Sequence, residues 1–119
     1  MFNPERTPKK HWHEMTPEER IADTLRHFPT LLRRWKGGHA RFWSLSVSHP
    51  AFIILIERPG VPGNLEIRST PDYICGPVEW NNADIEISFE PGIGYVIQDR
   101  AAGVRIVAAG VSLAENLAS

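Results

Sequence analysis

The sequence has few of the features that mark secreted, membrane-spanning or metal-stapled proteins. Its 119 residues include one cysteine, Cys75, which excludes an intrachain disulfide and a multi-cysteine zinc site. The longest apolar run covers residues 51–56, whereas a membrane-spanning helix needs about 20 apolar residues. The first residues contain no apolar stretch of the length that a secretory signal needs. We therefore expect a cytoplasmic protein without membrane association.

The chain also has almost no net charge, with 13 Lys and Arg against 14 Asp and Glu and a net of −1. This balance argues against a strongly basic protein that coats a polyanion, so we do not expect nucleic acid as the partner. The charge is nevertheless segregated, because residues 1–41 carry a net of +4 and residues 42–119 a net of −5. The densest basic cluster is Arg33, Arg34 and Lys36, which could bind an acidic partner or a phosphate. The alternative, which we favour, is that these cations complement the helix dipole and the protein's own acidic sheet.

Length and composition predict one globular domain. A chain with 42% hydrophobic and 23% charged residues is typical of soluble proteins, and 119 residues can build one hydrophobic core but not two domains. Early prolines and few large apolar side chains predict an extended arm over residues 1–15. The single domain is expected to cover residues 16–119.

A helix is predicted from Pro17 to about residue 36. Thr16 suits the N-cap, and Glu19 lies three residues later, which completes a capping box. Pro29 is expected to kink this helix or divide it in two, because proline removes a backbone donor and clashes with the preceding turn. One apolar stripe with spacings of three and four residues must pack on another element; it consists of Ile21, Leu25, Phe28, Leu32 and Trp35.

Alternating and continuous apolar runs predict strands in the remainder, at residues 40–48, 51–57, 65–69, 83–90, 95–99 and 104–109. Residues 59–63 are expected to form a loop, and residues 112–119 a helical turn or a frayed end. The predicted fold class is α+β, with a kinked N-terminal helix packed on a six- or seven-stranded antiparallel meander sheet. The alternative is a small β-sandwich or a half-open barrel with the helix as a plug.

No set of residues in the sequence converges on a known chemistry, so we expect no catalytic residues, no metal and no cofactor. The five histidines are scattered or lie in the N-terminal arm, without metal-ligand spacing. Cys75 has no predicted helix N-terminus or neighbouring base to activate it. Asp84, Glu86 and Glu90 alternate with apolar residues, which is typical of the solvated face of a strand. Cross-strand ion pairs of Glu86 with Arg68, or of Asp99 with Arg105, are expected to be structural only.

The periodicity explains Trp80 poorly, and Trp80 is followed by Asn81 and Asn82. An exposed tryptophan beside two amides could contact a protein or a sugar, so the three residues are candidates for a binding site. The alternative, which we favour, is a tryptophan that closes the end of the sheet over the core. The Asn81-Asn82 pair also predicts a tight turn, because asparagine tolerates positive φ.

These observations do not identify the function. The hypothesis they favour is a small non-catalytic binding or protein-interaction module, such as an inhibitor, an immunity-type protein or a regulatory partner. Its candidate binding residues are Arg33, Arg34, Lys36, Trp80, Asn81 and Asn82. The alternative is a small-ligand-binding protein or minor enzyme with a pocket between the curved sheet and the helix, drawing on Tyr73, Cys75, His49 or Tyr95. The oligomeric state is not indicated.

Overall fold

The computed structural model describes residues 12–45 and 52–117. Most of the predicted arm, the end of the predicted strand 40–48 and the first residue of the predicted strand 51–57 lie outside these ranges. A short 3-10 helix, η1 (Trp12–Glu14), occupies the last part of the predicted arm. None of the described helices is long and apolar enough to cross a membrane.

Two helices follow η1, as the sequence predicts. In α1 (Pro17–Leu25), the Thr16 side chain accepts a hydrogen bond from the backbone of Glu19, and the Glu19 side chain accepts one from the backbone of Thr16. The chain then bends, and α2 (Phe28–Trp35) begins with Pro29 in its first turn. Proline is tolerated there because the first N–H groups of a helix have no intrahelical acceptor. The expected division at Pro29 is therefore confirmed.

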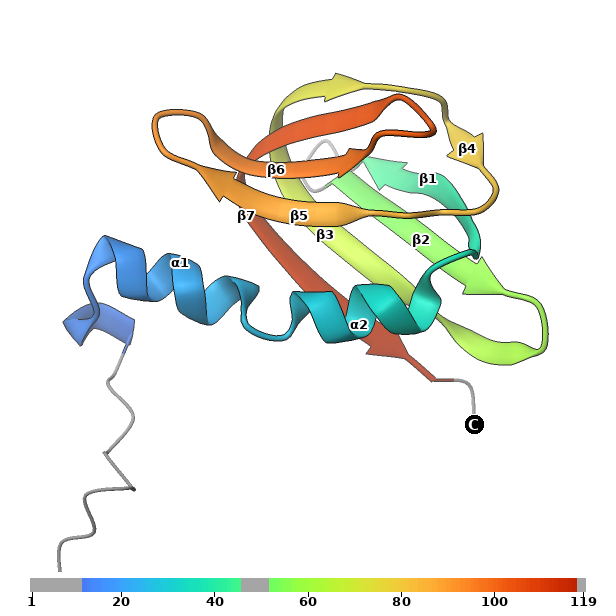
Figure 1. Cartoon of the computed structure of the whole chain (residues 1–119), viewed down its shortest axis with the longest axis horizontal. Coiled ribbons are helices and arrows are strands. Elements are labelled where there is room, and N and C mark those ends of the chain that lie inside the picture. The colour runs from blue at the N-terminus through green and yellow to red at the C-terminus, as the bar shows by residue number, and fades with distance from the viewer. Residues whose placement is uncertain (1–11, 46–51, 118–119) are drawn as a thin grey trace, which may run out of the picture.

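Seven antiparallel strands form one sheet in the order β4-β1-β2-β3-β7-β6-β5. The strands are β1 (His39–Leu45), β2 (Phe52–Arg58), β3 (Val61–Cys75), β4 (Glu79–Trp80), β5 (Glu86–Glu90), β6 (Gly94–Asp99) and β7 (Val104–Asn116). The sheet curls into a half-barrel, and the helices pack along it (Figure 1). The α+β class and the bent helix on an antiparallel sheet are thus confirmed, with the curvature of the half-open alternative.

Two strands are much longer than the sequence predicts. β3 starts within the predicted loop 59–63 and continues past Pro71, while β7 runs through the region expected to be helical or frayed. The two strands pair with each other from Asn64 opposite Asn116 to Cys75 opposite Arg105. Register shifts on both sides of Pro71 accommodate its missing N–H. The prediction was wrong because the hydrogen bonds of a long partner strand outweigh local turn formers.

The core fills the concave side of the sheet. All five residues of the predicted helical stripe contribute to it, with Phe28 and Trp35 buried and the other three partly buried against them. Inward-facing residues of the central strands complete the core: Ile54, Ile56, Leu65, Ile67, Ile97 and Ile106. Burial of side chains of this size contributes about 1.5–3 kcal/mol each before entropy is subtracted.

A buried carboxylate links the two edges of the sheet. Asp99, at the end of β6, is 1% exposed. Its Oδ2 accepts hydrogen bonds from the indole Nε1 of Trp80 in β4 and from the backbone N of Asp84 just before β5, both at 2.8 Å. Its Oδ1 accepts from the backbone N of Ala102 at 3.3 Å. The expected pairings of Asp99 with Arg105 and of Glu86 with Arg68 are wrong: Arg105 lies 3.8 Å from Glu90, and Arg68 lies 3.1 Å from Glu66.

Substitution of Asp99 by alanine is expected to lower the free energy of unfolding by roughly 3 kcal/mol. The change removes the acceptor of three N–H groups, of Trp80, Asp84 and Ala102, and each buried N–H left without a partner costs about 1–3 kcal/mol. Urea denaturation followed by tryptophan fluorescence measures the loss. The control is Asp72→Ala at an exposed position of β3, which should stay within about 0.5 kcal/mol of the wild type. Equal urea midpoints for Asp99→Ala and the wild type would contradict this role.

Candidate functional site

The fold brings together two of the segments that the sequence singles out, the C-terminal end of α2 and the turn between β4 and β5. Backbone hydrogen bonds join them directly, from Gly37 N to Ala83 O at 2.7 Å and from Ala83 N to Gly38 O at 2.9 Å. Gly37 has a φ of +87°, a conformation that glycine adopts without strain. The side chains also meet, with Lys36 Nζ 3.8 Å from Asp84 Oδ1. The basic cluster and the turn therefore border one region.

Within the basic cluster, Arg34 points to a different partner. Its guanidinium forms an ion pair with Glu115 of β7 at 2.5 Å. The same carboxylate accepts a hydrogen bond from the indole Nε1 of Trp35 at 2.7 Å. Arg58 donates to the backbone carbonyl of Arg34 at 2.7 Å, which satisfies one of the last carbonyls of α2. Arg34 thus attaches the helix to the sheet.

These contacts lower the pKa of the Glu115 carboxyl group. The hydrogen bond from Trp35 lowers its pKa from the ordinary value of 4.5, and the Arg34 guanidinium acts in the same direction, while burial opposes both. The ionised form is therefore favoured in the folded protein. Because Trp35 is fully buried, this carboxylate holds the end of α2 on the concave side of the sheet.

A cleft of about 410 Å³ opens between α2 and the start of β5. Its residues come from two segments: Pro29, Leu32, Arg33 and Lys36 from the helix, and Asp84, Ile85, Glu86 and Ile87 from the strand side. The helix wall therefore carries two cations and the strand wall two carboxylates. Among these four, Lys36 and Asp84 approach each other, whereas the side chains of Arg33 and Glu86 have no ion-pair or hydrogen-bond partner within the described residues.

β5 forms the strand wall of this cleft and is the last strand at its edge of the sheet. Within the described residues it pairs only with β6, from Glu86 opposite Gln98 to Glu90 opposite Gly94. The helices α1 and α2 lie near β5 (Figure 1). Ile87 and Phe89 pack against the core, so Glu86, Ser88 and Glu90 occupy the opposite face, in agreement with the predicted alternation.

Trp80, which the sequence offered as an exposed contact residue, is 8% exposed and belongs to the core. Its ring packs edge-to-face against Phe42 at 5.8 Å, and its indole N–H binds Asp99. This placement corresponds to the alternative interpretation, a tryptophan that closes the end of the sheet. Asn82 has a φ of +54°, so the predicted turn at Asn81-Asn82 is confirmed.

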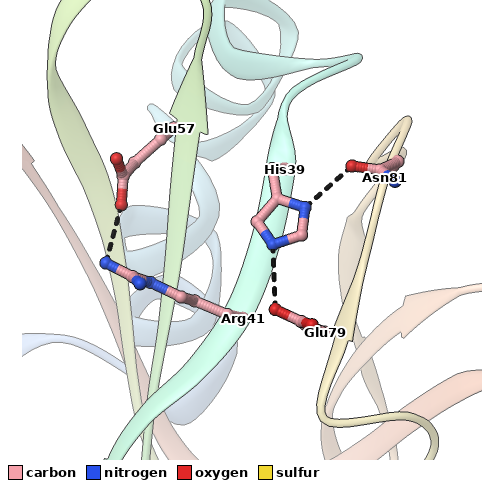
Figure 2. A network of polar contacts seen from close by, with 5 residues as sticks. All are labelled: His39, Arg41, Glu57, Glu79 and Asn81. Carbon is pink, nitrogen blue, oxygen red and sulfur yellow. Dashed lines mark hydrogen bonds and ion pairs between the residues drawn. The ribbon is translucent and has the colours of Figure 1, made fainter.

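Asn81 belongs to a polar network on the outer face of β1 and β4 (Figure 2). His39 of β1 lies between two acceptors: its Nδ1 is 2.8 Å from Asn81 Oδ1 and its Nε2 is 3.2 Å from Glu79 Oε2. The nearby Arg41 forms a separate ion pair with Glu57 of β2 at 2.9 Å. Two acceptors favour the imidazolium, so the contacts with Asn81 first and Glu79 second raise the pKa of His39 above 6.5.

Sequence reasoning assigned no role to His39, because its two partners lie about 40 residues further along the chain. No local pattern marks such a pairing. In the fold, His39 ties the two-residue strand β4 and the following turn to β1. The turn at Asn81-Asn82 leads to the strand wall of the cleft.

Of the residues offered for an enzyme-like pocket, Tyr73 and Cys75 lie together on the exposed surface of β3, whereas Tyr95 is buried. Tyr73 and Cys75 are exposed on β3, where a hydrogen bond to Cys75 is the main cause that raises the pKa of Tyr73. Tyr95 is buried against Phe89, with ring centroids 5.2 Å apart. His49 lies outside the described residues. Within the described part of the chain, no group of three His, Cys, Asp or Glu could hold a metal ion.

Comparison of the chain with known protein families, curated proteins and solved structures finds no match. The site is therefore defined by its geometry: a cleft bordered by an edge strand and a helix, with opposite charges on the two walls.

The attachment of α2 through Glu115 is expected to weaken in acid. Because the pKa of Glu115 is lowered in the folded state, its stabilising contribution is present above 4.5 and is lost as the pH falls through the folded pKa. Glu115→Gln should lower the free energy of unfolding by about 1–2 kcal/mol at neutral pH and reduce its acid dependence. Urea titrations at several pH values measure both effects. An unchanged acid dependence in Glu115→Gln would refute the assignment.

The His39 network is expected to contribute stability with the opposite pH dependence. Because the pKa of His39 is raised, the contribution is fully present below 6.5 and disappears as the pH rises through the folded pKa. An NMR titration of the imidazole protons should give a midpoint above 6.5 in the wild type. The midpoint should fall in Asn81→Ala and, to a smaller extent, in Glu79→Gln. A wild-type midpoint at or below 6.5 would show that the network does not form.

Proposed function

We propose that this protein is a small non-catalytic protein-interaction module that binds an extended segment of another protein along β5, in the cleft beside α2. The observation that carries the proposal is the position of β5, an edge strand whose unpaired side borders a cleft of about 410 Å³. A strand in this position can add a further strand from a partner, with main-chain hydrogen bonds for affinity and side-chain contacts for specificity.

The backbone of β5 supports this proposal. An edge strand presents a row of N–H and C=O groups that a partner strand can pair with. Apart from its ladder with β6 and the turn bond from Ile93 N to Glu90 O, no backbone hydrogen bond of β5 is formed within the described residues. Just before β5, by contrast, the backbone of Ala83 forms hydrogen bonds with the connection between α2 and β1. The row of unpaired backbone groups therefore does not extend to Ala83.

The side chains around the cleft provide the second support. Leu32, Ile85 and Ile87 supply apolar lining, while Arg33 and Glu86 supply charge without side-chain partners among the described residues. Apolar contact together with a few polar groups is what a specific binding site requires. Arg34 has a structural attachment and Trp80 is buried, so neither is part of the proposed surface.

Other features of the chain support a protein partner over a polyanion. The cations Arg34, Lys36 and Arg41 all face carboxylates of the same chain, which leaves little free positive surface for nucleic acid in this region. The single cysteine supports action in the cytoplasm, since small domains of oxidising compartments are usually stabilised by disulfides.

A small-molecule site is the second candidate, because the volume of the cleft lies in the range of ligand pockets, about 300–1,000 Å³. The edge strand favours a peptide, since a small ligand would not use an extended row of backbone groups.

A selection from a displayed library of random linear peptides, with the full chain as bait, tests the proposal. Selected peptides should slow amide exchange in β5, and Arg33→Trp, which fills the cleft, should weaken their binding by about tenfold or more. Arg68→Trp, on the outer face of the central strand β3, is the matched control and should bind as the wild type does.

Two results would overturn the proposal: the absence of enriched peptides, or enriched peptides that bind wild type and Arg33→Trp equally. Stabilisation of the wild type, but not of Arg33→Trp, by members of a small-molecule library would favour the second candidate instead.

A further inference from the structure

We infer that the segment bound along β5 carries a neighbouring pair of opposite charges, a basic residue opposite Glu86 and an acidic residue directed at Arg33. This inference rests on the proposed function and specifies the chemistry of the partner at the same cleft. It starts from the charges that the fold leaves without partners on the two walls.

The charged groups around the cleft differ in whether an opposite charge lies beside them. Lys36 lies 3.8 Å from Asp84, and Glu90, at the far end of β5, lies 3.8 Å from Arg105. These four groups therefore already have opposite charges beside them. Arg33 on the helix wall and Glu86 on the strand wall have none within the described residues. One free cation and one free anion thus face the same space from different elements.

The geometry of strand pairing fixes the face on which each side chain of an added strand lies. A strand paired with β5 places each of its residues directly opposite one residue of β5, with Cβ atoms about 4.5–5.5 Å apart on the same face. The residue opposite Glu86 therefore shares the face of Glu86. The next residue points to the other face, the face on which Ile87 packs and on which α2 lies.

The unpartnered charges and the geometry of strand pairing together define the pair of charges on the bound segment. A lysine or arginine opposite Glu86 forms a cross-strand pair of opposite charge, which stabilises strand pairing. Its neighbour in the sequence is directed at the helix, where the guanidinium of Arg33 is suited to a carboxylate. The following residues on that face meet Leu32 and Pro29 and are therefore apolar.

The same charges argue against a second copy of this chain as the occupant. Antiparallel pairing of β5 with itself around Ser88 places Glu86 opposite Glu90. Pairing around Ile87 places Asp84 opposite Glu90, and parallel pairing in register places Glu86 opposite itself. Like charges directly opposite each other destabilise a strand pair. These registers are therefore disfavoured for a second copy, and we take the occupant to be a segment of a different protein.

The probes for the test are blocked synthetic peptides with one central pair of residues, flanked by valine and threonine. The central pair is Lys-Glu in the first peptide, Gln-Gln in the second, Lys-Gln in the third and Gln-Glu in the fourth. Binding is measured by NMR titration of the full chain, through the amide signals of β5. At low salt, the Lys-Glu peptide should bind about fivefold tighter than the Gln-Gln peptide, and the difference should shrink as salt screens it.

Charge-neutral variants assign each part of this gain. Arg33→Gln should remove the advantage of the glutamate and keep that of the lysine, whereas Glu86→Gln should do the reverse. Arg68→Gln and Glu66→Gln, matched changes on the outer face of β3, should leave all four affinities as in the wild type. Within the described residues, neither the Arg33 nor the Glu86 side chain has a partner to lose, so both variants should fold with the wild-type melting temperature.

Equal binding of the four peptides at β5, or a gain that survives both Arg33→Gln and Glu86→Gln, would overturn the inference and leave the peptide-binding function intact. Library-selected peptides that bind at β5 when none of the four probes binds there would also overturn the inference and leave the peptide-binding function intact. A library that yields no peptide able to protect β5 would overturn the proposed function itself.

Discussion

The structure depends on the buried carboxylate of Asp99, which connects parts of the chain that the sheet alone would leave apart. Trp80, in the edge strand β4, and Asp84, in the segment that leads to the opposite edge strand β5, donate to the same oxygen at 2.8 Å. A buried acceptor with these donors is costly to lose, because each N–H would remain without a partner. The contact also positions residues 81–85, which connect the two edges and supply Asp84 and Ile85 to the lining of the cleft. The candidate site is thus a consequence of how the half-barrel is held together.

Charge has a structural and a functional part in this protein. The first third of the chain is basic and the remainder acidic, and three contacts join the two: Arg34 with Glu115, Lys36 with Asp84, and Arg41 with Glu57. Within the described residues, the segregated charge is therefore directed largely inward. Arg33 and Glu86 are the exceptions at the cleft, and their lack of partners is what makes a complementary segment of another protein attractive there.

Much of the fold follows from local chemistry. The capping box at Thr16 and Glu19, the stripe that ends at Trp35 and the position of Pro29 all have short-range causes, and the structure confirms them. The lengths of β3 and β7 do not, because glycine and proline favour turns unless a long partner strand satisfies the backbone around them. Gly63 shows the effect: a Cβ there would lie 1.9 Å from the carbonyl oxygen of Asn116, so the residue suits close strand contact rather than the expected loop.

The sequence by itself determined which faces are apolar and where the helix begins and bends. It also indicated Arg33, Lys36 and the turn at Asn81-Asn82 as candidate binding residues. Only the tertiary structure decided their partners. Periodicity assigns a side chain to a face, but hydrogen bonds between distant residues depend on strand order, which no local pattern encodes. For this reason the sequence does not indicate that Asp99 binds Trp80 or that His39 binds Asn81, whereas the burial of Trp80 agrees with the favoured interpretation. The cleft, too, arises only when an edge strand and a helix come to lie side by side.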